Sequence, residues 1–392
     1  MTSKQEPTTI LTQTFQAALD IVSKAMPSKS TLPVLASVYL KAADDEITMS
    51  ATDLETSIRV TIPASVKGDA WAACAPGSTL TSLVSAAPGD QVILTWDGES
   101  TTLNLKSGGT KSKLKSLAGD EFPDTRAPKS EAVGTIPASE LKSALRRVVI
   151  AASADESRPS LCVVQLALIN EKVYLAAADG FRLAVQHIER EFKFPRKASL
   201  LIPRGSAVKL AGILPDDNTE VQISVTDEDR ALLMTWEKTV FRAQLAEGNY
   251  PDWKTIIPNS WAHEVTLKTD ELQGAVKRAE IFAREANKVL RFAPNPDGGV
   301  RVYAVAEEIG QGETVLTDAS LPIPIAFNCT FVRQGLDALM ATPVHIRVNH
   351  SNAPAMFTNG SDKYRYLLMP MHTAAEASQA AAAAEASEAA ES

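Results

Sequence analysis

The chain has 392 residues, of which 45% are hydrophobic and 22% are charged, and its formal net charge is −8. These values exclude a fibrous or mostly disordered protein, and the length is that of two or three domains. The acidic balance argues against a protein that grips nucleic acid by bulk charge, although net charge says nothing about a local basic surface.

Membrane spans, a secretion signal and disulfides are not indicated. No run approaches the roughly 18 apolar residues of a membrane span, so no membrane partner is predicted, and the N-terminus lacks the apolar core of a secretory signal. Cys74, Cys162 and Cys329 lie far apart and form no CxxC pair. We expect a reduced, cytoplasmic protein in which these cysteines are small buried hydrophobic residues.

Six short amphipathic helices are predicted, each followed by strands whose apolar residues alternate. Ser78 and Ser139 are candidate N-caps of the second and third helix. The pair Gly108-Gly109 predicts a hairpin turn. In chain order the predicted helices are Phe15–Ala25, Ser78–Ala87, Ser139–Ala152, Ser206–Leu214, Thr269–Ala283 and Thr330–Met340.

The chain contains an internal repeat. Similar pairs of alternating runs begin at Leu35, Leu161 and Leu290. Asp53 and Asp179 follow equivalent strands, and the sequence 121–124 (EFPD) is echoed by 249–252 (NYPD). The spacing gives a period of about 128 residues, and each repeat carries two helices and several antiparallel strands. The fold class is therefore α+β.

The repeat predicts three domains and a tail. The predicted domains are residues 1–128, 129–253 and 254–373. Residues 374–392 are a low-complexity Ala/Glu/Ser segment with four glutamates and no Lys or Arg. Because such a segment has little apolar area to bury, we expect a disordered, solvated acidic tail.

Catalytic motifs are not found in the sequence. The five histidines form no HExxH pair, and no GxSxG, GxxxxGK[ST] or GxGxxG motif is present, so no metal or cofactor is predicted. Asp53 and Asp179 would be the candidate acids of an enzyme. Their repetition after equivalent strands favours a shared structural role instead.

Several motifs, taken in order on the threefold repeat, resemble one known family. They are Thr31-Leu32-Pro33-Val34-Leu35, Ala51-Thr52-Asp53-Leu54-Glu55, Glu121-Phe122-Pro123, Ala178-Asp179-Gly180-Phe181-Arg182-Leu183-Ala184, Tyr250-Pro251-Asp252 and Met369-Pro370-Met371. From about residue 11 to residue 373 the chain resembles the bacterial DNA sliding clamp, the beta subunit of DNA polymerase III.

The resemblance implies three tandem clamp domains and a head-to-tail homodimeric ring around double-stranded DNA. Such a ring holds DNA topologically and without sequence preference, so a weakly basic lining beneath an acidic exterior suffices. The implied protein is non-catalytic and associated with the nucleoid. Its implied partners are the replicative polymerase subunit, the clamp loader, repair polymerases and other proteins with a clamp-binding motif.

The resemblance also implies that basic residues contact DNA from the helices that line the hole and from the loops beside them. Lys29 precedes the Thr31-Leu32-Pro33 motif, and Arg158 precedes Leu161. The candidates are Lys24, Lys29, Arg146, Arg147, Arg158, Arg204, Lys209, Lys277 and Arg278.

A partner-peptide pocket is implied between the second and third domains, where leucine and methionine side chains suit an adaptable apolar groove. Compared with the family pattern, Ala178 replaces a usual Thr, Phe181 a usual His, Thr255 a frequent Arg and His372 a frequent Arg. These changes make the expected pocket less basic and more apolar. Its residues are Leu161, Gly180, Phe181, Arg182, Leu183, Pro251, Thr255, Ile256, Leu367, Met369, Pro370 and Met371.

The implied dimer seam pairs a basic edge of the first domain with an acidic edge of the third. Opposite charges there would steer closure. Ser112 stands where the family often has an apolar plug, so the dimer is expected to be weaker. The seam residues are Lys111, Ser112, Lys113, Leu114, Ile281, Phe282, Glu307 and Glu308.

Other hypotheses remain open at this point. The altered pocket also fits a second-copy or inhibitor-resistant clamp. A repeat-built scaffold that binds peptides but never DNA is an alternative of a different class, and an enzyme comes third. We further hypothesise that the acidic tail screens or competes for the peptide pocket, because it begins just after Met371.

Overall fold

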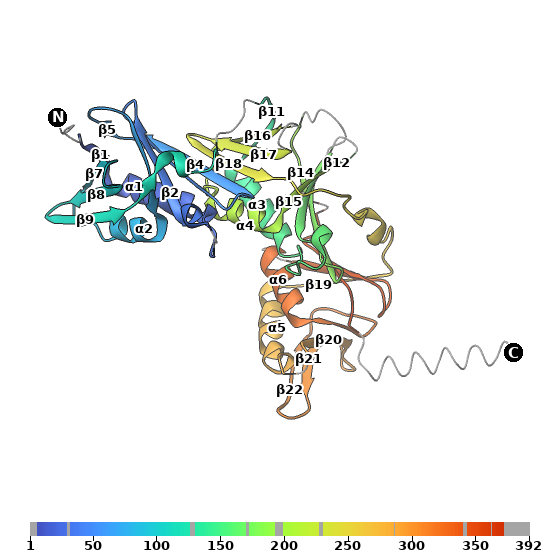
Figure 1. The fold of residues 1–392 in the computed structure, drawn as a ribbon. Coiled ribbons are helices and arrows are strands. Elements are labelled where there is room, and N and C mark those ends of the chain that lie inside the picture. The colour runs from blue at the N-terminus through green and yellow to red at the C-terminus, as the bar shows by residue number, and fades with distance from the viewer. Residues whose placement is uncertain are drawn as a thin grey trace. The chain divides into compact units, whose positions relative to one another are not determined.

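The structure is a computed structural model that describes residues 6–29, 32–125, 130–169, 172–192, 199–226, 230–285, 287–339, 343–361 and 363–371. The chain divides into two compact units (Figure 1). Unit 1 comprises Met1–Leu145 with Arg190–Glu247, and unit 2 comprises Arg146–Glu189 with Gly248–Ser392. The tail from residue 374 and His372 lie outside the described residues.

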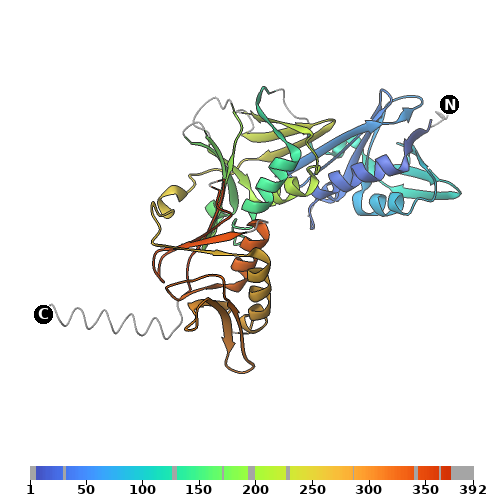
Figure 2. The same ribbon diagram turned by 180° about the vertical axis from the view of Figure 1, so that it is seen from behind.

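All six predicted helices are present: Thr269–Ala283 has the predicted bounds, and the ends of the other five are shifted by a few residues. Met340, the predicted end of the last helix, lies outside the described residues. Helix α1 shows why they form: Phe15, Ala18, Leu19 and Val22 recur at helical spacing and are all buried. In unit 2, α5 and α6 lie side by side in both views (Figures 1 and 2). The bounds are α1 Thr12–Val22, α2 Gly77–Ser85, α3 Ala138–Val149, α4 Arg204–Ile213, α5 Thr269–Ala283 and α6 Cys329–Leu339.

The predicted serine N-caps are wrong. Helices α2, α3 and α4 each follow directly on a strand that ends in proline: Pro76, Pro137 and Pro203. Proline has a fixed φ and no N–H, so it can end a strand and leave the helix to begin at the next residue. Ser139 consequently lies in the first turn of α3, where its hydroxyl contacts the Asn218 side chain at 3.0 Å.

Unit 1 contains two antiparallel sheets. The sheet with strand order β5-β1-β7-β8-β9 ends in the hairpin predicted at Gly108-Gly109. Its strands are β5 Ser65–Val66, β1 Thr8–Leu11, β7 Gln91–Asp97, β8 Thr102–Ser107 and β9 Thr110–Lys115. The second sheet runs through β10 Leu117–Ala118, β6 Trp71–Pro76, β2 Ser37–Ala43, β3 Glu46–Thr52, β4 Thr56–Pro63, β18 Thr239–Gln244, β17 Ala231–Trp236, β16 Glu220–Thr226 and β11 Ala132–Pro137. Strand β15, Ser199–Pro203, precedes α4.

Unit 2 is built in the same way. Seven strands pair in the order β12 Val163–Ile169, β13 Lys172–Ala178, β14 Arg182–Ile188, β26 Tyr364–Leu368, β25 Ala355–Thr358, β24 Val344–Val348 and β19 His263–Leu267. A second sheet has the order β22 Gly310–Leu316, β21 Val300–Ala306, β20 Val289–Pro294 and β23 Ile325–Asn328. In each unit one sheet therefore joins strands of two successive sequence repeats, through β4–β18 in unit 1 and β14–β26 in unit 2.

The cysteine prediction holds for two residues of three. Cys74 and Cys329 are buried, and burial raises the pKa of Cys74 to about 12. Cys162 is only half-buried; it directly follows the 3-10 turn Pro159–Leu161, in which Pro159 and Ser160 are exposed. Within the described residues, no helix is long and apolar enough to cross a membrane, and no group of three or more His, Cys, Asp or Glu side chains is placed to hold a metal ion.

Candidate functional site

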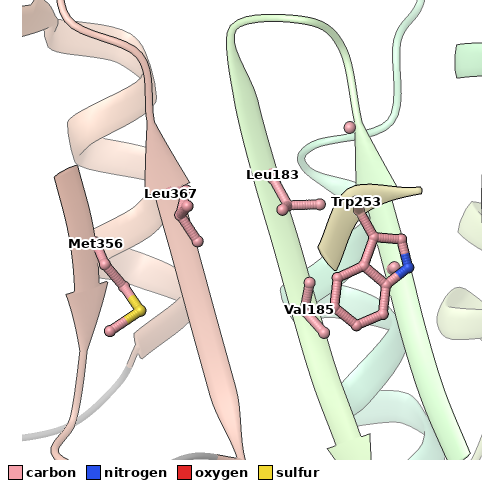
Figure 3. Close-up of a cluster of buried hydrophobic side chains, with 7 residues drawn as sticks. Leu183, Val185, Trp253, Met356 and Leu367 are labelled. Carbon is pink, nitrogen blue, oxygen red and sulfur yellow. The ribbon is translucent and has the colours of Figure 1, made fainter. Parts of the chain in front are cut away.

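An apolar cluster covers the sheet of unit 2 where two sequence repeats meet. Leu183 of β14 lies directly opposite Leu367 of β26, and both side chains are only 2% exposed. They share a cluster with Val185, Met356 and Trp253 (Figure 3). Trp253 comes from the linker, residues 248–262, which precedes β19. The predicted pocket residues Leu183 and Leu367 therefore form a buried floor.

Exposed apolar side chains accompany this floor. Phe181 is 56% exposed, Met369 41% and Ile256 40%. The Met369 backbone N–H donates to the Phe181 carbonyl at 2.8 Å, so the two residues lie next to each other at the ends of β14 and β26. Exposed apolar groups beside a buried apolar floor are typical of an interaction site. The other predicted pocket residues vary in exposure: Leu161, Pro370 and Met371 are half-buried, and Pro251 and Thr255 are exposed.

A tight turn presents Phe181. The Asp179 Oδ1 atom accepts hydrogen bonds from the N–H groups of Phe181 (2.9 Å) and Arg182 (3.0 Å). Asp53 accepts the equivalent two bonds from Glu55 (3.2 Å) and Thr56 (2.7 Å). The shared structural role predicted for the two aspartates is thus confirmed. Between Asp179 and Phe181, Gly180 has φ +92, which glycine adopts without strain.

Arg182, which begins β14, is held by several contacts within the protein. Its Nε atom is 2.9 Å from Asp179 Oδ2, and both side chains are about 90% buried. The guanidinium lies 4.1 Å from the Phe331 ring centroid and also bonds Gln334 of α6. It further reaches the hydroxyl of Tyr366 at 3.4 Å. These contacts fix the Arg182 side chain between the Asp179 turn and α6.

Tyr366 fixes α6 against β26. Its hydroxyl donates to the Phe331 carbonyl at 3.0 Å, and burial raises its pKa to about 12, so the donor proton is retained. Gly335 permits this close approach, because a Cβ there would come within 2.2 Å of the Tyr366 ring. The sequence offered no direct signal for this contact.

The equivalent junction in unit 1 is polar. Aligning Asp53 with Asp179 places Ser57 and Arg59 where unit 2 has Leu183 and Val185. Opposite Ser57, β18 carries Arg242 in the place of Leu367. Two similar sheet junctions therefore differ in surface chemistry, and of the two the β14–β26 junction offers an apolar floor. Comparison of the repeats strand by strand could have revealed this difference.

Five of the basic residues that are candidates for contacting DNA are exposed in the structure. Arg278 also donates to the Thr314 hydroxyl at 3.1 Å. These exposed basic residues lie on helices or just beside them, as predicted. They are Lys24, Lys29, Arg146, Lys277 and Arg278.

Three of the other four candidates are engaged within the protein, and the fourth, Arg204, is half-buried. Lys209 forms an ion pair with Asp53, and Arg158 pairs with Asp155 at 3.1 Å. Arg147 donates to Gln186 Oε1 at 3.3 Å and lies over the Tyr364 ring at 5.8 Å. Arg204 is half-buried, and its Nε atom is buried without a hydrogen-bond partner among the described residues.

The predicted seam residues lie on or beside β9 and β22, which are edge strands of their sheets in the described part of the chain. In unit 1, β9 is an edge strand on which Lys111 and Lys113 are exposed and Ser112 is half-buried. Leu114 is only 4% exposed and faces its own core, so its side chain does not project as a plug. Such an edge leaves backbone hydrogen-bonding groups available for another strand.

In unit 2, β22 is the corresponding edge strand. Ile281 is 64% exposed, whereas Phe282 is half-buried against β22, where a Cβ on Gly312 would come within 2.6 Å of its ring. Glu307 and Glu308 are exposed in the turn before β22. Sequence reasoning missed Ile309, which is 54% exposed beside these glutamates.

Family models match almost the whole chain. They describe the DNA polymerase III beta subunit: its N-terminal domain matches residues 8–126, its central domain residues 135–252 and its C-terminal domain residues 254–372. The beta sliding clamp of Synechococcus elongatus is 27% identical over 362 residues, which cover 90% of this chain and 96% of that protein. The beta sliding clamp of Bacillus subtilis is 26% identical over 365 residues, with the same coverage of both proteins.

Solved structures share the fold. The DNA polymerase sliding clamp of Bacillus subtilis superposes with a TM-score of 0.85 at 24% identity, and the beta subunit of Thermotoga maritima with 0.85 at 23%. Each comparison covers 94% of this chain and 100% of the other. The chain therefore belongs to the DNA polymerase III beta subunit family, the DNA sliding clamps, which are non-catalytic processivity factors of replication.

Proposed function

We propose that two copies of this chain close head to tail into a ring that encircles double-stranded DNA. The ring contains three clamp domains per chain, at residues 1–128, 129–253 and 254–373. The names of its relatives and the spans of the three family models support this proposal. A ring that acts on chromosomal DNA would lie at the nucleoid, in the cytoplasm.

In this proposal the DNA is held by topology and only weakly by charge. Exposed basic residues such as Lys24, Arg146 and Lys277 attract the DNA phosphates whatever the DNA sequence. The net charge of −8 keeps overall attraction low. Because the ring makes few contacts with phosphates, exchanging them for the next ones along the DNA costs little free energy, so the ring can slide.

The seam is proposed to join β9 of one copy to β22 of the other. Both are edge strands, and the first carries Lys111 and Lys113 whereas Glu307 and Glu308 lie beside the second. Complementary charge steers association, and strand pairing would satisfy the open backbone groups. Ile281 and Ile309 add exposed apolar area at the second edge.

The β14–β26 junction is proposed to bind short extended peptides of the replicative polymerase, the clamp loader and repair polymerases. The observation that carries this proposal is the apolar floor of Leu183 and Leu367, flanked by exposed Phe181 and Met369. Phe181 and the exposed Thr255 make this surface more apolar than the usual family pattern. A second-copy or inhibitor-resistant clamp with altered partner preference is the alternative that these two residues favour.

Retention on circular DNA tests the central proposal. The chain is loaded onto nicked plasmid circles with its clamp loader and ATP, and the complex is isolated by gel filtration. We expect it to stay on circles and to be lost when a restriction enzyme linearises the DNA. Equal loss from circles and linear DNA, with peptide binding intact, would instead support a peptide scaffold that does not bind DNA. Sedimentation of the chain alone reports the dimer independently.

A further inference from the structure

A basic groove lies on the sheet of unit 2, beside the linker. Its volume is about 540 Å³. Four cationic residues line it: Lys172 of β13, Arg365 of β26, Arg347 of β24 and Lys254 of the linker. No carboxylate is among its lining residues in the described part of the chain.

The groove also has an apolar, aromatic wall. Trp253 and Trp261 of the linker and Tyr174 of β13 contribute to its lining. Trp253 and Tyr174 pack together with ring centroids 5.7 Å apart. Trp253 and Met356 line the groove and also belong to the apolar cluster of the β14–β26 junction, so the groove borders that cluster. Figure 3 shows both side chains in the cluster.

Two glutamates lie close to the groove. Arg347 Nε is 2.7 Å from Glu264, and Lys363 is paired with Glu189 at 2.6 Å. Lys172 and Lys254 are exposed. A groove lined by four cationic residues, and by no carboxylate in the part of the chain that the structure describes, attracts a segment of negative charge.

The chain itself contains such a segment. Residues 374–392 hold Glu376, Glu385, Glu388 and Glu391 and no Lys or Arg. Strand β26 supplies Arg365 to the groove and leads within a few residues to this tail. Each extended residue spans at most about 3.3–3.6 Å, so a glutamate some 15 residues beyond β26 can reach as far as ~50 Å. A tethered ligand of this kind has an effective concentration of roughly millimolar.

We propose that the glutamates of the C-terminal tail bind in this basic groove of the same chain. The apolar pocket is the poorer site for the tail, because Phe181, Ile256 and Met369 offer it no charge and Arg182 is committed to Asp179. The tail has no large apolar side chain to fill that pocket. The inference is independent of DNA binding, so it stands or falls separately from the proposed ring.

Zero-length crosslinking of the full-length chain tests the proposal. A carbodiimide couples a glutamate to a lysine in contact with it, and mass spectrometry identifies the pair. We expect the tail glutamates to couple to Lys172 and Lys254 about tenfold more than to Lys277 and Lys288, which are exposed lysines of the same unit. Salt at about 1 M should abolish the preference, because it screens exposed charges.

Two variants sharpen the test. Replacing Arg347 and Arg365 by Gln leaves both reactive lysines in place, and it should lower coupling to Lys172 and Lys254 severalfold. Replacing all four tail glutamates by Gln in the full-length chain should increase quenching of tryptophan fluorescence by iodide. The control is Trp261→Phe in the same background, which removes one of the two groove tryptophans whose fluorescence is measured.

Three results would overturn the proposal. Coupling spread evenly over all lysines would show that the tail has no fixed site. Coupling between isotopically light and heavy copies would show that the tail reaches another chain instead. Equal binding of an added acidic peptide by the parent chain and by the Glu→Gln variant would show that the groove takes a partner segment and is not occupied by the tail.

Discussion

Leu183 and Leu367 face each other across the β14–β26 pair, although they belong to different sequence repeats. Their contact places an apolar floor at the junction of the repeats. The matching junction in unit 1 pairs Ser57 with Arg242. Both junctions are antiparallel strand pairs, so the side chains at these four positions make one junction apolar and the other polar.

Phe181 is predicted to contribute to peptide binding and little to stability. Its side chain is 56% exposed, so Phe181→Ala should change the free energy of unfolding by less than about 0.5 kcal/mol. Loss of an aromatic contact should weaken binding of an apolar clamp-binding peptide roughly tenfold. Calorimetric titration measures the affinity. Leu32→Ala, at a residue 50% exposed in unit 1, is the matched control and should leave affinity unchanged.

Arg182 is predicted to be a stability determinant. Arg182→Ala would leave Asp179 buried without its charge partner, at a cost of roughly 3 kcal/mol. Urea unfolding of the chain measures this change. Lys363→Ala breaks the exposed pair with Glu189 in the same unit and should have no measurable effect. Equal effects of the two substitutions would contradict the structural role assigned to Arg182.

Leu54 is predicted to be strained. Its φ is +76, in the position that Gly180 occupies in the second repeat. Its side chain is 56% exposed, so little apolar contact is lost on removing it. Leu54→Gly should therefore stabilise the protein by about 0.5–1 kcal/mol, because L residues are disfavoured at this φ. Leu32→Gly, where φ is −101, should destabilise it instead. Thermal or urea unfolding of both variants decides the sign.

Arg146 and Arg147 are predicted to differ despite their adjacency. Arg146 is exposed, so Arg146→Glu should weaken DNA retention and lower its salt dependence by roughly one counterion, with stability unchanged. Arg147 bonds Gln186 and lies over Tyr364, so Arg147→Glu should lower the unfolding midpoint. Retention at several salt concentrations, with unfolding curves of both variants, tests this. Unchanged retention in Arg146→Glu would remove that residue from the DNA-contacting set.

His187 is predicted to make stability depend on pH. Burial, together with the charge of Lys172, lowers the pKa of His187 below 6.5, and its ring stacks on Tyr174 with centroids 5.0 Å apart. Lys363 and Arg365 act in the same direction, and Glu189 opposes them. Because the folded state favours the neutral ring, this contribution is complete above pH 6.5 and is lost as pH falls below that value.

The pH effect is measured as the difference in urea midpoint between pH 8 and pH 5.5. His187→Gln should show a smaller difference than the parent chain, because the variant lacks the titrating group. His263→Gln is the control, at a half-buried histidine of the same unit. A parent chain and His187→Gln variant with the same pH dependence would contradict the assignment.

Local patterns in the sequence determined much of the architecture. The 3.6-residue spacing of apolar side chains placed all six helices, including Thr269–Ala283 with the bounds that the structure shows. The glycine pair 108–109 predicted a hairpin, and the repeated aspartates indicated a shared structural role, which in the structure is a common turn. These features depend on residues close together in the chain, so a single sequence contains the information. The helix starts were less predictable, because proline-ended strands replaced the expected serine caps.

Only the tertiary structure decided which residues of similar type are exposed and which are engaged within the protein. Arg146 and Arg147 look alike in sequence, yet Gln186 and Tyr364 engage the second. Leu114 is expected at the dimer seam from its position in the sequence, but its side chain is only 4% exposed and faces its own core. Charge and hydropathy are properties of one residue, whereas burial and pairing depend on strands brought together from distant repeats. The apolar floor of Leu183 and Leu367 exists for that reason: neither residue forms it until β14 and β26 pair.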